Sequence, residues 1–205
     1  MSFNFELYFK HAPAASFFFL AIAVTFVGQF FQHNLMEKFG FNAYLIRTKK
    51  EYHRFLTSML VHANLMHFLF NILSYYFFAF TLEMLFLGTV KFVIILLVSQ
   101  IVAQLYDYFR WKDNPNFWSV GASGAISGLI FSYIAIRPTA TIFLFFIPMP
   151  AWVFGILFVA YSAYAGRSYA GGINHFAHLF GAIAGFILTI LLRPDVLNTW
   201  LGFIM

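Results

Sequence analysis

The segment GASGAISGLIFSYIAIRP, residues 121–138, opens on glycine and serine, continues as an apolar run, and closes on arginine and proline. As a helix, its roughly 16 apolar residues span about 24 Å, less than the ~30 Å hydrocarbon layer of a membrane. Arg137 and Pro138 place its far end at one surface, so the end with Ser123 is expected partway down the bilayer. Backbone N–H groups at such a helix start need protein or water beside them. The segment therefore predicts a wet site inside the membrane next to a serine.

The composition of the whole chain is that of a membrane protein. Of 205 residues, 62% are hydrophobic and only 9% are charged, against about 25% charged in soluble domains. Six apolar stretches follow one another, at about residues 14–31, 55–82, 91–108, 121–136, 148–165 and 173–192. Backbone groups must be paired in lipid, so each stretch is expected to be helical. We predict an all-α polytopic membrane protein, with residues 1–205 forming one domain and the six helices forming a bundle whose fourth helix starts mid-membrane.

The charges and the missing cysteines narrow the possible partners. The chain has no cysteine, which excludes disulfides and thiolate ligands. Its net charge of +5 is spread over the loops and indicates contact with anionic headgroups of the lipid bilayer. No clustered basic face with exposed aromatic residues is present, so no nucleic-acid partner is expected. The first apolar stretch lacks a cleavage site after a short apolar region, so we expect it to be retained.

Two connecting segments have unusual compositions. Residues 32–54 mix charges with aromatic residues, which suits a structured loop partly embedded at the membrane interface. Residues 166–172 are short and rich in glycine, as a mobile lid would be.

Ser123 and His178 are the strongest candidates for chemistry. Ser123 stands between glycines at a helix start, although Gly124 and Gly128 also fit a plain packing face of GxxxG type. His178 is followed by Gly181 and Gly185, which form a second GxxxG pattern. The helix with Ser123 and the helix with His178 would thus each present a glycine face, and close packing of these faces could bring the hydroxyl and the imidazole together. A serine hydroxyl needs such a base to act as a nucleophile. The fourth and sixth stretches contain no carboxylate, so we predict a Ser–His dyad; a structural histidine is the alternative.

His67 and Asn71 are the candidates for stabilising a developing oxyanion. Their i, i+4 spacing puts both on one helix face, and both can donate hydrogen bonds. An interhelical hydrogen-bonding pair is the alternative interpretation. His62 lies about 140° around the same predicted helix, so we expect it to point elsewhere and to be structural.

Two other protease chemistries fit poorly. His175 and His178 share a face, but no HExxH pattern, acidic partner or cysteine accompanies them, so no metal site is expected. An aspartyl mechanism needs two neighbouring carboxylates, and Asp107 has no second aspartate within a span.

Together the motifs resemble those of the rhomboid family of intramembrane serine proteases. Arg54 followed by the H-x4-H-x3-N spacing of His62, His67 and Asn71 resembles the second-span motif of the family. Residues 121–125, GASGA, resemble its GxSG motif. Residues 177–185, AHLFGAIAG, resemble its AHxxGxxxG motif. The three motifs occur in order on the second, fourth and sixth stretches, and the resemblance covers essentially the whole chain, as a minimal six-helix bacterial type.

The resemblance implies a role for each matching residue. Ser123 would attack the scissile carbonyl and His178 would transfer the proton, while the Ser123 N–H, His67 and Asn71 would bind the oxyanion. His62 and Arg54 would brace the loop before the second span. The glycines that would support the close helix contacts are Gly121, Gly124, Gly181 and Gly185. Family substrates are single transmembrane segments, admitted laterally past the fifth span, and no cofactor is expected.

The chain departs from the family pattern at two places. Ser127 stands where an aromatic residue often stacks under the histidine, and Phe176 or Tyr133 are possible substitutes. His53 stands where a tryptophan commonly precedes the loop arginine.

Orientation in the membrane is a point of conflict. We expect a bacterial inner membrane, because the chain is compact and shows no organelle presequence. The resemblance implies cytoplasmic termini and an active site that opens outward. Four basic residues would then be inside (Lys10, Lys91, Arg137, Arg193) and eight outside (Lys38, Arg47, Lys49, Lys50, Arg54, Arg110, Lys112, Arg167). This distribution opposes the positive-inside rule; we follow the motifs.

An active endopeptidase is thus the leading hypothesis. A catalytically silent, client-binding relative is the first alternative, although such proteins usually lose the serine or the histidine. An unrelated channel or transporter is the second, although repeats and paired intramembrane charges are missing. The oligomeric state and the physiological substrate are left open.

Overall fold

The computed structural model describes residues 5–144, 146–167 and 174–204. The helices in chain order are α1 (Phe5–His11), α2 (Pro13–Phe31), α3 (Leu35–Phe39), α4 (Ala43–Lys49), α5 (Arg54–Thr57), α6 (Leu65–Thr81), the π-helix η1 (Leu82–Leu87), α7 (Gly88–Trp111), α8 (Ser123–Ile136), α9 (Ala151–Ala165), α10 (His175–Leu192) and α11 (Val196–Ile204). Strands β1 (Thr141–Leu144) and β2 (Ile147–Pro150) form one antiparallel hairpin. Most of the glycine-rich segment predicted to be a lid lies outside the described residues.

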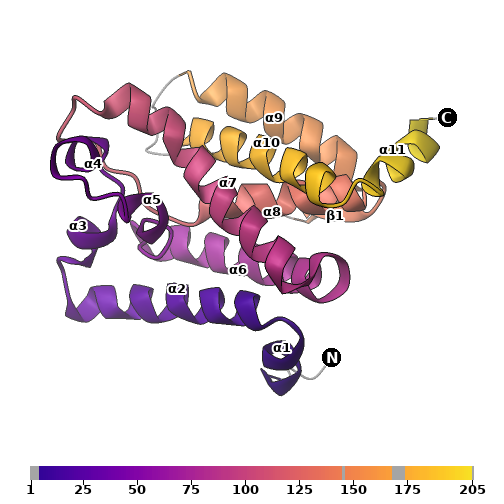
Figure 1. Ribbon diagram of the computed structural model, residues 1–205, viewed down its shortest axis with the longest axis horizontal. Helices are drawn as coiled ribbons and strands as arrows, with labels where there is room; N and C mark the ends of the chain where they lie inside the picture. Colours follow the sequence, from indigo (N-terminus) through magenta and orange to yellow (C-terminus); the bar gives the residue numbers. More distant parts are fainter. Residues whose placement is uncertain (1–4, 145, 168–173, 205) are drawn as a thin grey trace.

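The long helices lie side by side and carry the lengths that a bilayer requires (Figure 1). Within the described residues, three helical runs are long and apolar enough to cross a membrane, namely α2, the 47-residue run Leu65–Trp111 and α10; α8 and α9 are shorter apolar helices. The 47-residue run contains α6, η1 and α7, and α6 and α7 run in different directions (Figure 1). Gly88, at the junction of η1 and α7, has a φ of +67°, which suits glycine. The chain is therefore a multi-pass integral membrane protein.

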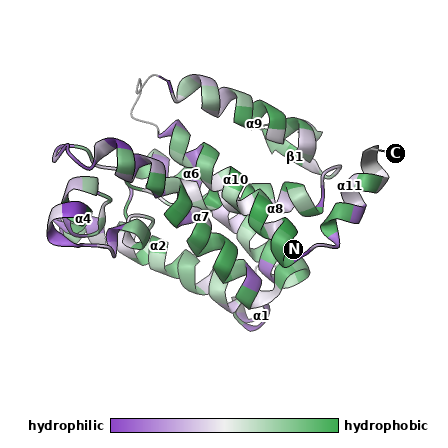
Figure 2. Cartoon of the chain, turned by 45° about the horizontal axis from the view of Figure 1, so that its top comes forward, coloured by the Kyte–Doolittle hydropathy of each residue, from purple (hydrophilic) through white to green (hydrophobic). Residues whose placement is uncertain are grey.

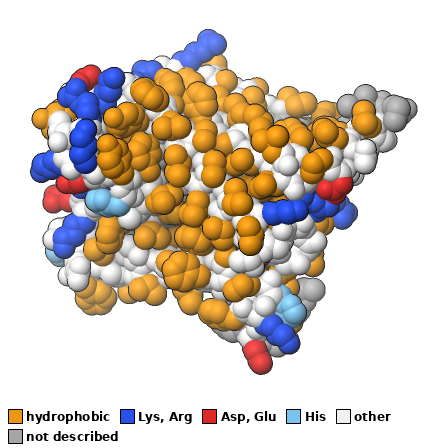
Figure 3. All heavy atoms as spheres, in the orientation of Figure 1, with side chains coloured by type: hydrophobic (Ala, Val, Ile, Leu, Met, Phe, Trp, Pro, Cys, Tyr) orange, Lys and Arg blue, Asp and Glu red, His pale blue; other side chains and the backbone are white. Residues whose placement is uncertain are grey.

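The surface has an apolar belt between two more polar ends. In Figure 2 the long helices are green over most of their length, and purple residues gather around α4. In Figure 3 hydrophobic side chains cover the middle of the visible face, and Lys and Arg side chains cluster at the end where α3–α5 lie. Both ends of the described chain lie at the opposite end of the molecule (Figure 1). This arrangement matches a bundle whose interfacial loop sits at one membrane surface.

Helix α8 is the centre of the bundle. Its 14 residues are mostly buried, and α6, α7, α9 and α10 pack around it. The glycine faces of α8 and α10 lie against each other: a Cβ on Gly181 would overlap the carbonyl oxygen of Gly124, and one on Gly185 would overlap that of Gly128. Only glycines let the two backbones approach this closely.

The second apolar stretch begins later than predicted. Residues 55–82 were expected to form one helix, but a short helix α5 is followed by turns and α6 begins at Leu65. The Asn64 side chain accepts the His67 N–H at 2.8 Å, so it caps α6 and starts the helix there. The expectation of a purely helical fold is also wrong at the β1–β2 hairpin.

A buried glutamate from η1 caps the start of α2. Glu83 is 2% exposed, and its two carboxylate oxygens accept the N–H groups of Ala14 at 3.1 Å and Ala15 at 2.6 Å. The Thr89 hydroxyl donates to the same carboxylate at 2.8 Å. Ala12, at the N-cap position, has no side chain that could do this. A negative group at a helix N-terminus satisfies its unbonded N–H groups and its dipole.

Glu83→Ala is expected to lower the free energy of unfolding by about 3 kcal/mol, because two buried N–H groups lose a charged acceptor. Glu83→Gln keeps one acceptor oxygen and should cost less. Reversible unfolding in mixed micelles measures both changes, with Glu6→Ala, an exposed residue of α1, as the control. Equal stabilities of wild type and Glu83→Ala would contradict this role.

Candidate active site

Ser123 is the first residue of α8, and the backbone around it is arranged to leave donors free. Gln100 Oε1 accepts the Ala125 N–H at 3.2 Å. Neither the Ser123 N–H nor the Gly124 N–H makes a hydrogen bond within the described part of the chain. Unbonded N–H groups at a helix N-terminus favour a negative charge beside them.

The turn before α8 is held from two sides. Gly121 has φ +109° and donates its N–H to the Ser58 carbonyl oxygen at 2.9 Å. Two positions earlier, Ser119 pairs through its backbone with Phe41 of the interfacial loop, at 2.9 and 3.1 Å. The turn that presents Ser123 is therefore tied both to the loop and to the residues before α6.

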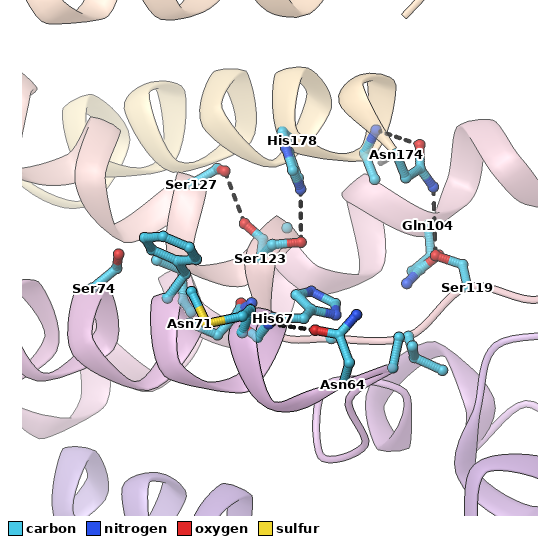
Figure 4. A pocket seen from close by; sticks show the side chains of 18 of the residues that line it. Asn64, His67, Asn71, Ser74, Gln104, Ser119, Ser123, Ser127, Asn174 and His178 are labelled. Atoms are coloured by element: carbon cyan, nitrogen blue, oxygen red, sulfur yellow. Dashed lines mark hydrogen bonds between the residues drawn. The ribbon is translucent and has the colours of Figure 1, made fainter. Parts of the chain in front are cut away.

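His178 on α10 meets the serine hydroxyl directly. Its Nε2 lies 2.7 Å from Ser123 Oγ. Figure 4 shows the imidazole pointing from α10 to Ser123, with His67 and Asn71 of α6 on the opposite side. A hydrogen bond of this length between a hydroxyl and an imidazole is the geometry from which a base can take a proton.

The α6 side of the site carries the two predicted oxyanion donors. A Cβ on Gly121 would lie 2.6 Å from His67 Nε2, so the imidazole occupies the space that only a glycine leaves open. Asn71 is 6% exposed, and its Nδ2 donates to the His67 carbonyl oxygen at 2.7 Å. An amide nitrogen has two N–H groups, so one remains for another acceptor.

These groups line a cavity of about 710 Å³. Ser123, His178, His67 and Asn71 all contribute to its wall. Apolar side chains of α6, α8 and α9 form part of the wall, among them Met66, Phe70, Ile126, Ile130 and Phe158. The cavity is large enough to hold several residues of an extended peptide beside the serine.

His62 does not point away from His67 as predicted. It precedes α6, so the helical angle used in the prediction does not apply, and the two rings lie 5.1 Å apart. His62 is 1% exposed, and neither ring nitrogen has a hydrogen-bond partner among the described residues. Its backbone N–H and carbonyl bind the side chain of Gln29 at 3.0 Å each, which ties the turn to α2.

The buried Arg54 side chain holds together the interfacial loop, residues 32–54, through hydrogen bonds to its backbone. It is 5% exposed, and its guanidinium donates to the carbonyl oxygens of Glu37 at 2.8 Å and Gly40 at 2.7 Å, and to the Glu51 carboxylate at 2.6 Å. The guanidinium also lies 5.6 Å from the centre of the Trp118 ring. The aromatic partner of the arginine thus comes from the segment before α8, while His53 occupies the place of the usual tryptophan.

Neither suggested replacement for the stacking aromatic lies against His178. The Tyr133 ring packs with Phe78 and Phe86, and the Phe176 ring packs with Tyr106 and Phe180. Ser127 donates its hydroxyl to the Ser123 carbonyl oxygen at 2.8 Å. Among the described residues, the His175 ring approaches the His178 ring, with centroids 6.1 Å apart and the planes nearly perpendicular.

Sequence reasoning missed a polar face of α7 that borders the site. Gln100, Gln104 and Asp107 are all buried, and both glutamine amides lie within hydrogen-bonding distance of the Ser58 hydroxyl, at 3.2 and 3.4 Å. Their i, i+4, i+7 spacing inside an apolar stretch was the available signal. Within the residues the structure describes, no group of three or more His, Asp or Glu side chains is placed to hold a metal ion.

Comparison with known proteins identifies the family. The Rhomboid domain model matches residues 49–195, which is most of the chain and includes α5 through α10. The chain is also 33% identical over 143 residues to a Bacillus subtilis (strain 168) protein described as "Putative rhomboid protease YdcA", and the aligned region covers 69% of this chain and 67% of that protein. The chain belongs to the rhomboid family.

Proposed function

We propose that this protein is an intramembrane serine endopeptidase that cleaves transmembrane segments of other membrane proteins with Ser123 as nucleophile and His178 as base. The observation that carries the proposal is the 2.7 Å contact between Ser123 Oγ and His178 Nε2 at the wall of a cavity within the bundle. Membership of the rhomboid family supports the reaction class.

The first half of the reaction forms an acyl-enzyme. Ser123 Oγ attacks the scissile carbonyl carbon while its proton passes to His178 Nε2. The carbonyl oxygen becomes an oxyanion, which accepts hydrogen bonds from the Ser123 N–H, His67 and Asn71. When the C–N bond breaks, His178 returns the proton to the leaving amine. The acyl group stays on Ser123 as an ester.

The second half releases the acyl product. A water molecule gives a proton to His178 Nε2 as its oxygen attacks the ester carbonyl. The oxyanion forms again beside the same donors. The C–O bond to Ser123 then breaks, and the serine oxygen takes its proton back from His178. The product is a carboxylic acid that loses its remaining proton to water and becomes a carboxylate, and the free enzyme is restored.

The substrate is a transmembrane helix that unwinds locally beside Ser123. The cavity wall combines apolar side chains of α6 and α9, such as Phe70 and Phe158, with the polar groups of the site. Separation of these two helices would admit a helix from lipid and leave the dyad near water. No cofactor takes part in this scheme, and the partners are substrate helices and the bilayer.

Reconstitution with a model single-span substrate tests the proposal. Proteoliposomes that contain both proteins should release two fragments whose ends, read by mass spectrometry, share one cleaved bond within or at the edge of the span. A fluorophosphonate should label the peptide that contains Ser123. An intact substrate that nevertheless binds would instead favour the silent, client-binding alternative, and a label on another residue would overturn the nucleophile assignment.

Asn71→Ala is expected to lower kcat by about 10²–10³-fold, as for loss of one oxyanion donor. KM should change little, because the interaction forms with the transition state. Asn116→Ala, an exposed residue on the segment before α8, serves as the matched control. Steady-state kinetics on the reconstituted enzyme measure both constants, and a wild-type kcat in Asn71→Ala would exclude the amide as a donor.

We further propose six crossings, with the cavity end facing the extracytoplasmic side of a bacterial inner membrane. The chain has no cysteine, so single cysteines can report orientation without background. A membrane-impermeant maleimide should label Lys49→Cys in intact spheroplasts, and Arg137→Cys only after permeabilisation; both residues are exposed. The reverse pattern would mean that the charge distribution, not the family motif, sets the orientation.

A further inference from the structure

A buried carboxylate outside the dyad reaches the helix that carries His178. Asp107, near the C-terminal end of α7, has no exposed surface. Its Oδ2 accepts a hydrogen bond from Asn174 Nδ2, and its Oδ1 has no partner among the described residues. An isolated buried carboxylate is costly, so its contact with Asn174 calls for an explanation.

Asn174 links that carboxylate to the first turn of α10. Its Oδ1 accepts the Ala177 N–H at 3.1 Å, which makes it the N-cap of the helix. Its backbone carbonyl accepts the His178 N–H at 3.3 Å. Its Nδ2 also lies 3.5 Å from the Ser119 hydroxyl, on the segment that leads to Ser123. The start of α10 is thus joined to α7 through Asp107 and to the turn before α8 through Ser119; Figure 4 shows the contact with Ser119.

Among the described residues, no hydrogen bond to the second ring nitrogen orients the His178 imidazole. In a Ser–His–Asp triad a carboxylate on Nδ1 fixes the ring. Here Nδ1 of His178 makes no hydrogen bond to any described residue, and the ring's hydrogen bond is the one to Ser123 Oγ. The position of the ring therefore depends on its contact with the His175 ring and on the backbone that carries it, one turn into α10.

We propose that Asp107 and Asn174 are a positioning pair: the carboxylate on α7 holds the N-cap of α10, and the N-cap sets His178 Nε2 at hydrogen-bonding distance from Ser123 Oγ. This inference rests on the proposed function. A carboxylate thus serves the dyad indirectly, through a side-chain amide and a helix turn. Small displacements of the helix start would move Nε2 away from the hydroxyl.

Exchanging the Asp107 and Asn174 side chains tests whether the hydrogen bond between them positions His178. Asn174→Asp places two carboxylates face to face, and Asp107→Ala removes the acceptor. The double variant Asp107→Asn with Asn174→Asp restores one donor and one acceptor, and aspartate is as good an N-cap as asparagine. Asp113→Asn is the matched control, because Asp113 lies just beyond α7 and is exposed in its ion pair with Arg47.

Each protein is reconstituted at full length, and kcat, KM and fluorophosphonate labelling are measured. Both single variants should lower kcat by about 10–100-fold, the effect of a misplacement near 1 Å, with KM nearly unchanged. Labelling should become slower but reach the wild-type final extent, because the folded fraction is intact. The double variant and Asp113→Asn should behave as wild type.

The outcomes separate this inference from the proposed function. Equal labelling of wild type and Ser123→Ala would overturn both. Loss of labelling in Ser123→Ala together with wild-type kcat in Asp107→Ala would overturn the positioning pair alone. A lower final extent at an unchanged rate would mean that the pair only stabilises the fold. If a single variant does not fold, the double variant decides: rescue supports the pair, and a double variant that stays slow or unfolded overturns it.

Discussion

Ser123→Ala is expected to lower kcat for cleavage of a transmembrane substrate by about 10⁴-fold or more, because the nucleophile belongs to a unit whose parts act together. The rest of the cavity wall is unchanged in this variant, so substrate should still bind with nearly unchanged affinity. Fragment release over long incubations and fluorophosphonate labelling measure the loss.

Ser132→Ala is the matched control for this change. It is the same substitution on the same helix, and the Ser132 hydroxyl meets the Thr189 hydroxyl at 2.7 Å, away from the cavity. It should keep its labelling and lose about 1 kcal/mol of stability, the value of one buried hydrogen bond. If Ser123→Ala kept even a tenth of the wild-type kcat, another group would have to be the nucleophile.

His178→Ala is expected to cause a loss of the same order, about 10⁴-fold, because Ser123 Oγ would have no base within reach. The hydroxyl alone would label slowly with a fluorophosphonate, so the labelling rate should fall in parallel with kcat. His33→Ala, an exposed histidine of the interfacial loop, should leave both rates unchanged.

Combining Ser123→Ala with His178→Ala tests whether the two residues act together. Because one proton transfer needs both groups, the second substitution should add almost nothing to the first. If the two losses multiplied instead, the residues would act independently, and the 2.7 Å contact would be structural and not catalytic.

Much of the architecture could be predicted from the order of residues. A bilayer has a fixed thickness and offers no hydrogen bonds, so apolar stretches of the required length are helices wherever they occur. Polar residues inside such stretches are costly and therefore few. This is why Ser123, His178, His67 and Asn71 stood out, and all four line one cavity. The roles given to them remain predictions.

The exact ends of helices were harder to predict, because side chains and neighbouring turns compete for the same backbone N–H groups. The start of α6 depends on whether the Asn64 side chain or a further helical turn satisfies the His67 N–H, and the side chain does so. The interpretation of His62 was wrong for the same reason, since the residue lies before the helix and not on it. The β1–β2 hairpin takes up the first three residues of the predicted fifth stretch, which include Pro148 and Pro150, and α9 begins only after them, at Ala151.

By itself the sequence determined that the protein lies in a membrane, which segments are helices, and which few side chains could do chemistry. The reason is that a lipid bilayer limits the length and polarity of every spanning segment. The tertiary structure alone decided which of these side chains meet. Ser123 and His178 are 55 positions apart, and Asp107 and Asn174 are 67 apart. Contacts over such separations depend on how closely helices pack, and here that distance is set by the glycine contact of Gly124 with Gly181.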